Sequence, residues 1–266
     1  MSVLLLGSAV PGQATIITFD DLLGGGYVPG GYGDRVADSG GGTGYMQGNG
    51  WTPNISVSFD TLNLATHSLT FGGLRTWGGG YGDLYMAVWP TAESGHAGWF
   101  AFTPDPGYAV RINAFQLGGY PLRDYDGQPV QITDSSFVVL WTGDGHVEGE
   151  EGGSPSHSDY APNLVSSGTV YLIYGNNWNI GIDWIDFDQI RLCGTLAPPD
   201  FNQDCAVDGL DVELFNVCAS GPAVAVSAEC ATRDLDGDGD ADQSDFALLQ
   251  RCYTGPGRIA SPDCAD

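Results

Sequence analysis

The sequence predicts a mainly β protein, in which a jelly-roll-like β-sandwich is followed by a small helical module. Three observations lead to this fold class. Short segments rich in β-branched and aromatic residues alternate with glycine-rich turns up to about residue 195. A 34-residue period then repeats from Asp200 onward, and the six cysteines form three couples twelve residues apart. We therefore expect an apolar segment at 1–14, a sandwich domain at 15–195 and the repeated module at 196–266.

About ten strands are expected in the sandwich domain. Helical periodicity is absent there, and many short strands in succession are typical of two packed sheets with a jelly-roll topology. ITFDD at 17–21 and GIDWIDFDQI at 181–190 are similar to strands of secreted bacterial surface β-sandwich proteins, including those with a PEP-CTERM sorting tail. The segments with strand patterns are 14–20, 54–60, 67–71, 85–89, 98–103, 109–115, 136–141, 169–174 and 182–192.

Each repeat of the C-terminal module begins with a twelve-residue loop that carries oxygen-bearing side chains at positions 1, 3, 5, 9 and 12. Ca²⁺ takes six to eight oxygen ligands, and such a loop supplies them from positions 1, 3, 5 and 12, the carbonyl of position 7 and a water held by position 9. The spacing therefore predicts two calcium ions. Their ligands would be Asp200, Asn202, Asp204, the Ala206 carbonyl, Asp208 and Asp211 in the first loop, and Asp234, Asp236, Asp238, the Asp240 carbonyl, Asp242 and Asp245 in the second.

An amphipathic stretch follows each loop, at 212–218 and 246–252, and its apolar spacing predicts a helix. No helix pattern precedes either loop, so the repeated unit is a loop followed by one helix. Position 6 of each loop needs a left-handed turn, and it holds Gly239 in the second loop but Cys205 in the first. Because a non-glycine residue there costs about 1–2 kcal/mol, we expect the first calcium site to be the weaker one.

This duplicated half EF-hand, which ends each loop in Asp rather than Glu, resembles the type I dockerin module of cellulosome proteins over 200–266. The resemblance implies two calcium ions and docking onto a cohesin domain through the helices and loop positions 10 and 11. Those positions differ between the repeats, so the two docking surfaces are not equivalent. The expected partner-binding residues are Leu210, Leu214, Gln243, Ser244 and Leu248, and we expect the packed helices to leave Phe215 and Leu249 exposed beside them.

The six cysteines allow fifteen disulfide connectivities. A repeated unit should repeat its own bridge, which favours Cys218–Cys230 and Cys252–Cys264 and leaves Cys193 to pair with Cys205. A zinc site is disfavoured because the chain has no CxxC spacing with nearby histidine. Oxidised cysteines indicate a secreted or cell-surface protein.

The net charge of the chain argues against two classes of binding partner, and its N-terminal segment indicates secretion. The chain has 33 acidic residues against 8 arginines, no lysine and a net charge of −25. Nucleic acids and anionic membranes bind clustered basic residues, so neither is expected as a partner. The segment MSVLLLGSAVPGQA resembles the end of a secretory signal with cleavage after Ala14, and if retained it would suit pairing with a neighbour's sheet edge. No apolar run is long enough to span a bilayer.

Two further sets of residues in the sandwich are candidate sites. Aromatic residues between glycines can form flat platforms for sugar rings, and the candidates are Trp51, Trp77, Tyr81 and Trp178, with Tyr32. Acidic residues flank the first and last strands, which are neighbours in many jelly rolls, so a third calcium ion would be held there by Asp20, Asp21, Asp186 and Asp188.

Catalytic motifs are absent from the sequence. The four histidines share no ligand spacing, and neither GxSxG nor HExxH occurs. The acidic run Glu148, Glu150 and Glu151 lies in a glycine-rich loop and is interpreted as solvated, although two carboxylates that hydrolyse glycosides need no fixed sequence spacing.

Three hypotheses follow from these patterns. The first is a non-catalytic, secreted protein that assembles or attaches through its calcium module, to a cohesin-like partner or to itself in a surface fibre. The alternative is a carbohydrate-binding module of a polysaccharide-degrading complex, and the third is an enzyme acting on polysaccharide. The first is favoured because the specific motif concerns attachment.

Overall fold

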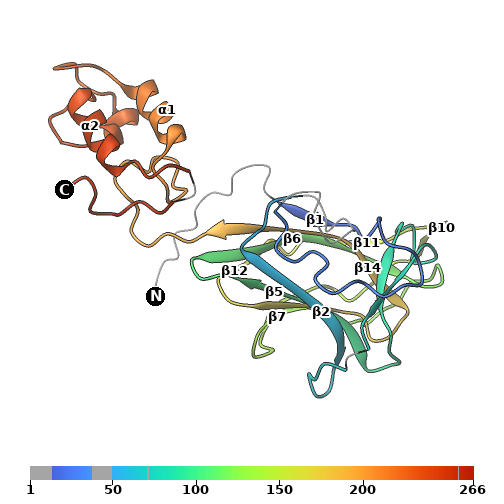
Figure 1. The fold of residues 1–266 in the computed structure, drawn as a ribbon. Helices are drawn as coiled ribbons and strands as arrows, with labels where there is room; N and C mark the ends of the chain where they lie inside the picture. Colours follow the sequence, from blue (N-terminus) through green and yellow to red (C-terminus); the bar gives the residue numbers. More distant parts are fainter. Residues whose placement is uncertain (1–13, 38–49, 71, 257) are drawn as a thin grey trace. The chain divides into compact units, whose positions relative to one another are not determined.

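The computed structural model describes residues 14–37, 50–70, 72–256 and 258–266 (Figure 1). By their contacts, the described residues form two compact units, one within Val10–Gln189 and one within Ile190–Asp266. The segment expected as a signal or a retained strand, 1–14, lies outside the described residues except for Ala14.

The first unit is built from antiparallel strands, as Figure 1 shows. Its longer strands are β2 (Ile55–Asn63), β5 (His96–Pro104), β6 (Tyr108–Gly119) and β14 (Ile180–Arg191). The others are β1 (Thr15–Ile17), β3 (Leu74–Trp77), β4 (Ala87–Pro90), β7 (Val130–Asp134), β8 (Val139–Thr142), β9 (Glu150–Glu151), β10 (Ser154–Pro155), β11 (Ser158–Tyr160), β12 (Leu164–Ser166) and β13 (Val170–Tyr174).

Among the described residues, these strands form two main sheets and one small hairpin. The first sheet has the order β11-β6-β14-β4-β3, with β1 paired to β14 and β12 paired to β6. The second sheet has the order β2-β5-β13-β7-β8, and β9 pairs with β10. The expected pairing of the first and last strands is present, since Thr15 lies opposite Phe187. The segment 67–71 is not a strand in its described part, where Leu69 makes a single bridge to Leu62.

The core lies between the two main sheets, because alternate residues of each strand point to one face. Phe102 of β5 and Phe187 of β14 are fully buried, and their ring centroids lie 4.9 Å apart across the sheets. The chain therefore contains a β-sandwich, whereas a jelly-roll topology stays a prediction.

Halfway along strand β14, the alternation of residues that face the core shifts by one position. Ile182, Ile185 and Phe187 all lie in the core, so the two-residue alternation is broken between Ile182 and Ile185. Trp184 has a φ of +50° at this break. As a result Asp183, which strict alternation from Ile182 would point to solvent, is buried.

The second unit contains helices α1 (Gly209–Cys218) and α2 (Gln243–Cys252) and the 3₁₀ helix η1 (Ala228–Arg233). Asp208 and Asp242 cap the N-termini of α1 and α2. The expectation that Phe215 and Leu249 lie on the surface is wrong, because both are buried in the small core of this unit. The ring of Phe215 packs against that of Phe246 in α2, with ring centroids 5.6 Å apart.

Three disulfides join the described cysteines, Cys193–Cys205, Cys218–Cys230 and Cys252–Cys264. These are the pairs that the duplication favours. Each bridge closes a short segment of the second unit, which constrains the unfolded chain. Among the described residues, no helix is both long and apolar enough to cross a membrane.

Candidate metal centre

Each acidic loop is closed onto the start of its helix by the aspartate at position 12. In the second loop, Asp245 is fully buried and accepts hydrogen bonds from the backbone N–H groups of Leu235 (2.6 Å), Asp236 (3.1 Å) and Asp242 (2.8 Å). The bond from Asp242 belongs to a capping box, in which Asp242 accepts in return from the first turn of α2. The loop and the helix are therefore fixed relative to each other by one carboxylate.

Asp211 performs the same closing role in the first loop. It is also fully buried, and it accepts from the N–H groups of Phe201 (2.7 Å), Asn202 (3.3 Å) and Asp208 (2.9 Å). The left-handed turn expected at position 6 is present in both loops, with φ of +73° at Cys205 and +97° at Gly239. The two loops thus share one backbone scheme.

The second loop gathers its carboxylates around Asp245. One oxygen each from Asp234, Asp236 and Asp245 lie within 4.8 Å of one another, and the same holds for Asp240, Asp242 and Asp245. Oxygens that share one Ca²⁺ lie at most about 5 Å apart, because each is about 2.3–2.6 Å from the ion. The donor set and its spacing therefore fit a calcium ion.

The electrostatics of the second loop also favour a cation. Desolvation, and then the neighbouring carboxylates, raise the pKa of Asp236 and of Asp240. Oδ2 of Asp240 accepts a hydrogen bond from the N–H of Ala223, while Oδ1 is buried without a hydrogen-bond partner among the described residues. The sequence assigned only the Asp240 carbonyl to the metal, and its buried carboxylate is a feature that the loop pattern does not reveal.

The first loop arranges its side chains differently. Asn202 donates an amide hydrogen bond to Asp204 (3.0 Å), so a neutral side chain stands where the second loop has the carboxylate of Asp236. Burial, followed by the charges of Asp211 and Asp204, raises the pKa of Asp200 to about 6. Among the described residues, no group of three acidic side chains lies within metal-binding distance in this loop. The residues fit a calcium ion less well than those of the second loop.

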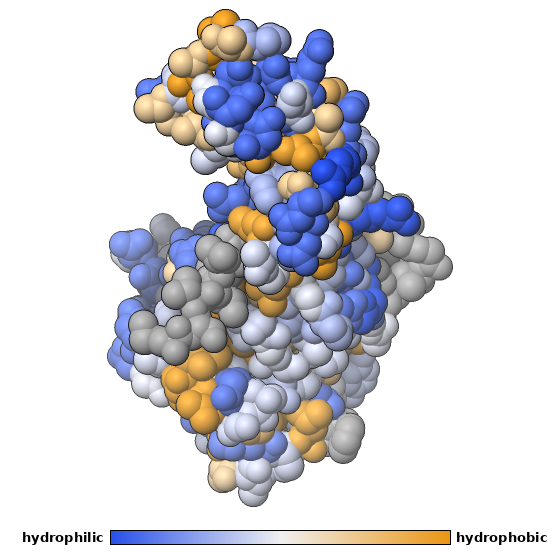
Figure 2. Space-filling model, turned by 90° about the vertical axis from the view of Figure 1, so that its left-hand side faces the viewer, coloured by the Kyte–Doolittle hydropathy of each residue, from blue (hydrophilic) through white to orange (hydrophobic). Residues whose placement is uncertain are grey.

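The residues expected to bind a partner lie on the two helices. Leu210, Gln243 and Ser244 are exposed at the helix starts, and Leu214 and Leu248 are half-buried. On the face drawn in Figure 2, hydrophobic side chains form small separate groups among hydrophilic ones. A partner contacting the expected residues would meet both leucine and polar side chains.

The aromatic candidates for sugar binding divide into two groups. Trp51, Trp77 and Trp178 are each 44–46% exposed, so their rings can contact a ligand. Tyr81 and Tyr32 are buried, with hydroxyl groups that donate to the Trp178 carbonyl and to Asp21 respectively. The expectation that these two tyrosines stack against a sugar is wrong, because both rings are buried in the sandwich.

The expected third calcium site is not assembled from its four candidates. Asp188 is paired with Arg111 and Asp186 accepts from the Asn113 amide, so both carboxylates already have partners. Asp21 accepts from Tyr32, and Asp20 is exposed. No metal-binding group of acids is found here among the described residues.

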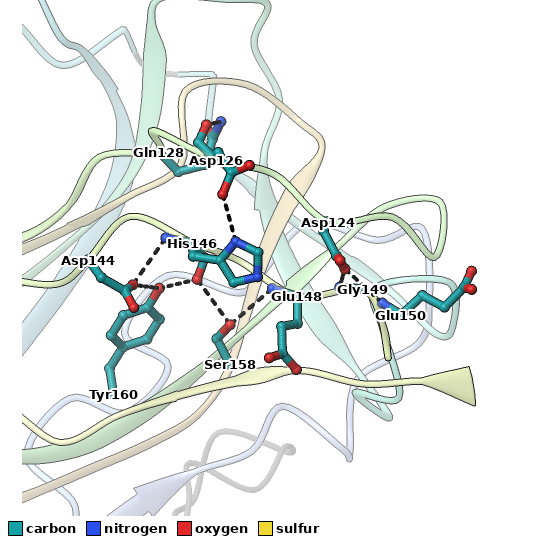
Figure 3. A network of polar contacts seen from close by, with 10 residues as sticks. All are labelled: Asp124, Asp126, Gln128, Asp144, His146, Glu148, Gly149, Glu150, Ser158 and Tyr160. Atoms are coloured by element: carbon teal, nitrogen blue, oxygen red, sulfur yellow. Dashed lines mark hydrogen bonds and ion pairs between the residues drawn. The ribbon is translucent and has the colours of Figure 1, made fainter. Parts of the chain in front are cut away.

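A polar network between the segments 124–128 and 144–150 and strand β11 contains a histidine, an aspartate and a serine (Figure 3). Nδ1 of His146 donates to Asp126 over 2.7 Å, which raises the pKa of the imidazole. Ser158 Oγ, however, donates to the carbonyl of His146 and accepts from the N–H of Glu148. The hydroxyl is used by the backbone rather than directed at the imidazole, so this arrangement is not that of a nucleophilic triad.

The backbone of the acidic run near this network donates hydrogen bonds to a neighbouring carboxylate. Asp124 accepts hydrogen bonds from the N–H groups of Gly149 and Glu150, which lower the pKa of Asp124. Glu150 and Glu151 are exposed as expected, but they form the short strand β9 rather than a loop, and Glu148 is half-buried.

No protein-family model and no curated protein matches the sequence. Among solved structures, the chain is similar to Arthrobacter globiformis T6 isomalto-dextranase complexed with panose, at 11% identity and a TM-score of 0.28, over 52% of this chain and 23% of that chain. It is also similar to TmCBM61 in complex with β-1,4-galactotriose, at 14% identity and a TM-score of 0.23, over 52% of this chain and 88% of that chain. A third similar structure is CBM29_1, a family 29 carbohydrate-binding module from Piromyces equi, at 14% identity and a TM-score of 0.22, over 51% of this chain and 89% of that chain. The match thus spans less than a quarter of the isomalto-dextranase, and similarities this weak carry no argument about function.

Proposed function

We propose that this chain is a non-catalytic, secreted protein whose C-terminal unit binds Ca²⁺ and uses the ion to attach the sandwich to a protein partner. The observation that carries the proposal is the position of Asp245. Its carboxylate lies within metal-binding distance of two pairs of acids and also closes the loop onto α2. A cation bound there would act directly on the start of the helix.

The link from calcium to attachment rests on charge. Without a cation, the five aspartates of the two metal-binding groups repel one another within one short loop. Calcium removes that repulsion and stabilises the helix that carries Gln243, Ser244 and Leu248. The three disulfides support a location in an oxidising, extracellular environment.

The partner proposed is a cohesin-like domain or another copy of the chain, and both are tested with the full protein. Sedimentation and electron microscopy are carried out on the chain alone and mixed with a purified cohesin, in calcium and in excess chelator. We expect a complex or oligomer in calcium that dissociates in chelator. Oligomers that persist in chelator and disperse only on reduction would contradict the proposal, as would the absence of any assembly in calcium.

A second candidate function, carbohydrate binding, is favoured by the three exposed tryptophans of the sandwich. Large aromatic side chains at the surface commonly mark contact sites, because exposing them to water is unfavourable. This candidate is compatible with the first, since one unit would bind the glycan and the other would attach it. Co-sedimentation of the full chain with insoluble polysaccharides tests it, and a chain that stays in the supernatant would contradict it.

A further inference from the structure

A pocket of about 460 Å³ lies beside the glycine-rich segment that follows β3, and none of the expected site residues lines it. Its volume is within the range of small-molecule sites in proteins. Its lining includes Gly78, Gly79, Gly82, Asp83, Tyr85 and Pro155.

The glycines leave bare backbone at the pocket surface. A Cβ at Gly79 would meet nothing within 4 Å, so this part of the pocket is open to a ligand. Gly82 is different, because a Cβ there would lie 1.8 Å from the Ser156 carbonyl oxygen. Gly82 therefore permits close packing of the loop against the segment after β10, and this packing helps to fix the pocket.

One ordered carboxylate belongs to the pocket. Oδ1 of Asp83 lies 2.6 Å from Nδ1 of His157, which donates to it. The other ring nitrogen of His157 lies 3.5 Å from Asp159, so the imidazole is held between two carboxylates. This fixes the orientation of Asp83, whose side chain is 49% exposed and can therefore accept hydrogen bonds from a ligand.

An exposed aromatic ring belongs to the same pocket. Tyr85 is 72% exposed, whereas its neighbours Leu84 and Met86 are buried. The backbone on both sides of Tyr85 is thus anchored while its ring stays at the surface. A flat ring on a fixed backbone can stack against the apolar face of a sugar.

We propose that this pocket binds a neutral sugar unit of a polysaccharide, with Tyr85 stacking on the ring and Asp83 accepting hydrogen bonds from sugar hydroxyls. The inference rests on the carbohydrate-binding candidate above and gives it a site separate from the three exposed tryptophans. An anionic ligand is disfavoured by Asp83 itself and by the net charge of −25. A sugar matches the pocket because its hydroxyls donate and its C–H face is apolar.

The test is affinity electrophoresis of the full chain in calcium, through gels that contain xyloglucan, galactan, galactomannan, dextran or mixed-linkage β-glucan. We expect at least one polysaccharide to retard the protein. Y85A should weaken that retardation at least tenfold and D83N at least threefold, while Y85F should bind nearly as well as the native chain because it keeps the ring. Y27A is the matched control, since it removes a tyrosine ring that is 60% exposed but does not line the pocket.

Two outcomes would overturn the inference, and they are distinguishable. Retardation that is unchanged in Y85A and D83N, or lost equally in Y27A, would place the sugar outside this pocket while leaving the carbohydrate-binding function in place. No retardation by any of the five polysaccharides would overturn both. Circular dichroism of each variant separates lost binding from lost folding.

Discussion

The two units of the chain stabilise their folds by different means. The core of the sandwich contains 26 buried hydrophobic residues among those described, whereas the core of the C-terminal unit contains six. The smaller unit instead has three disulfides and a loop, 234–245, whose carboxylates gather within metal-binding distance of one another. Small units with little apolar core generally need covalent or metal support. Removing that support should therefore affect one unit and leave the other folded.

The largest expected effect is the loss of structure in the C-terminal unit after reduction and chelation together. Each disulfide joins cysteines twelve positions apart and contributes roughly 2–4 kcal/mol, in a unit whose core contains six residues. Limited proteolysis with mass spectrometry should show cleavage between Cys193 and Asp266, with the strands of the sandwich protected. Equal cleavage in both units would refute the contrast between them.

The next effect concerns a buried carboxyl of the sandwich. Burial raises the pKa of Asp183 to about 8, and the N–H of Trp184 donates to it over 2.7 Å. The fold therefore favours the neutral acid. Its contribution to stability is fully present below pH 3.8, the ordinary value, and is lost as the pH rises to about 8.

Asp183→Asn tests this titration. The variant should gain stability relative to the native chain as the pH rises, by the order of 5 kcal/mol at pH 8. The measurement is urea unfolding of the sandwich transition at several pH values in excess calcium. Asp159→Asn, which changes an exposed carboxyl, is the control. A variant whose stability follows the same pH dependence as the native chain would show that Asp183 titrates normally.

Local patterns predicted the acidic loops well, and long-range contacts explain what they missed. The 34-residue period placed Asp211 and Asp245 at equivalent positions, and the structure gives them equivalent backbone hydrogen bonds. The burial of Asp183 follows from the break at Trp184, where β14 changes from pairing with β4 to pairing with β1. No local pattern contains that change. Similarly, Tyr81 is buried through a contact with a residue 97 positions away.

The two loops themselves provide a sharper comparison. Asp245→Ala should weaken the tighter calcium site at least 100-fold, about 2.7 kcal/mol, because Asp245 belongs to both groups of acids. Asp211→Ala should affect only the weaker site. Calorimetric titration of the full chain with calcium measures both. The comparison fails if Asp211→Ala removes the tighter site, or if the native chain binds a single ion with no contribution from Asp245.

The smallest expected effect is at position 6 of the second loop. Gly239 has a φ of +97°, so Gly239→Ala should cost about 1–2 kcal/mol and weaken calcium binding about tenfold. Gly209→Ala is the matched control, because Gly209 lies in the first turn of α1 with open space at its Cβ. Equal calcium affinities in the two variants would show that alanine adopts the left-handed turn at position 239 without cost.

Hydrogen exchange of the full chain, measured with saturating calcium and with excess chelator, tests the calcium-dependent order of the C-terminal unit most directly. We predict that chelation accelerates exchange across the second loop and α2 first, then across the first loop and α1, while amides of β5, β13 and β14 keep their protection. Unchanged protection of α1 and α2 in chelator would contradict the account, because calcium would then have no control over the helices that carry the proposed partner surface.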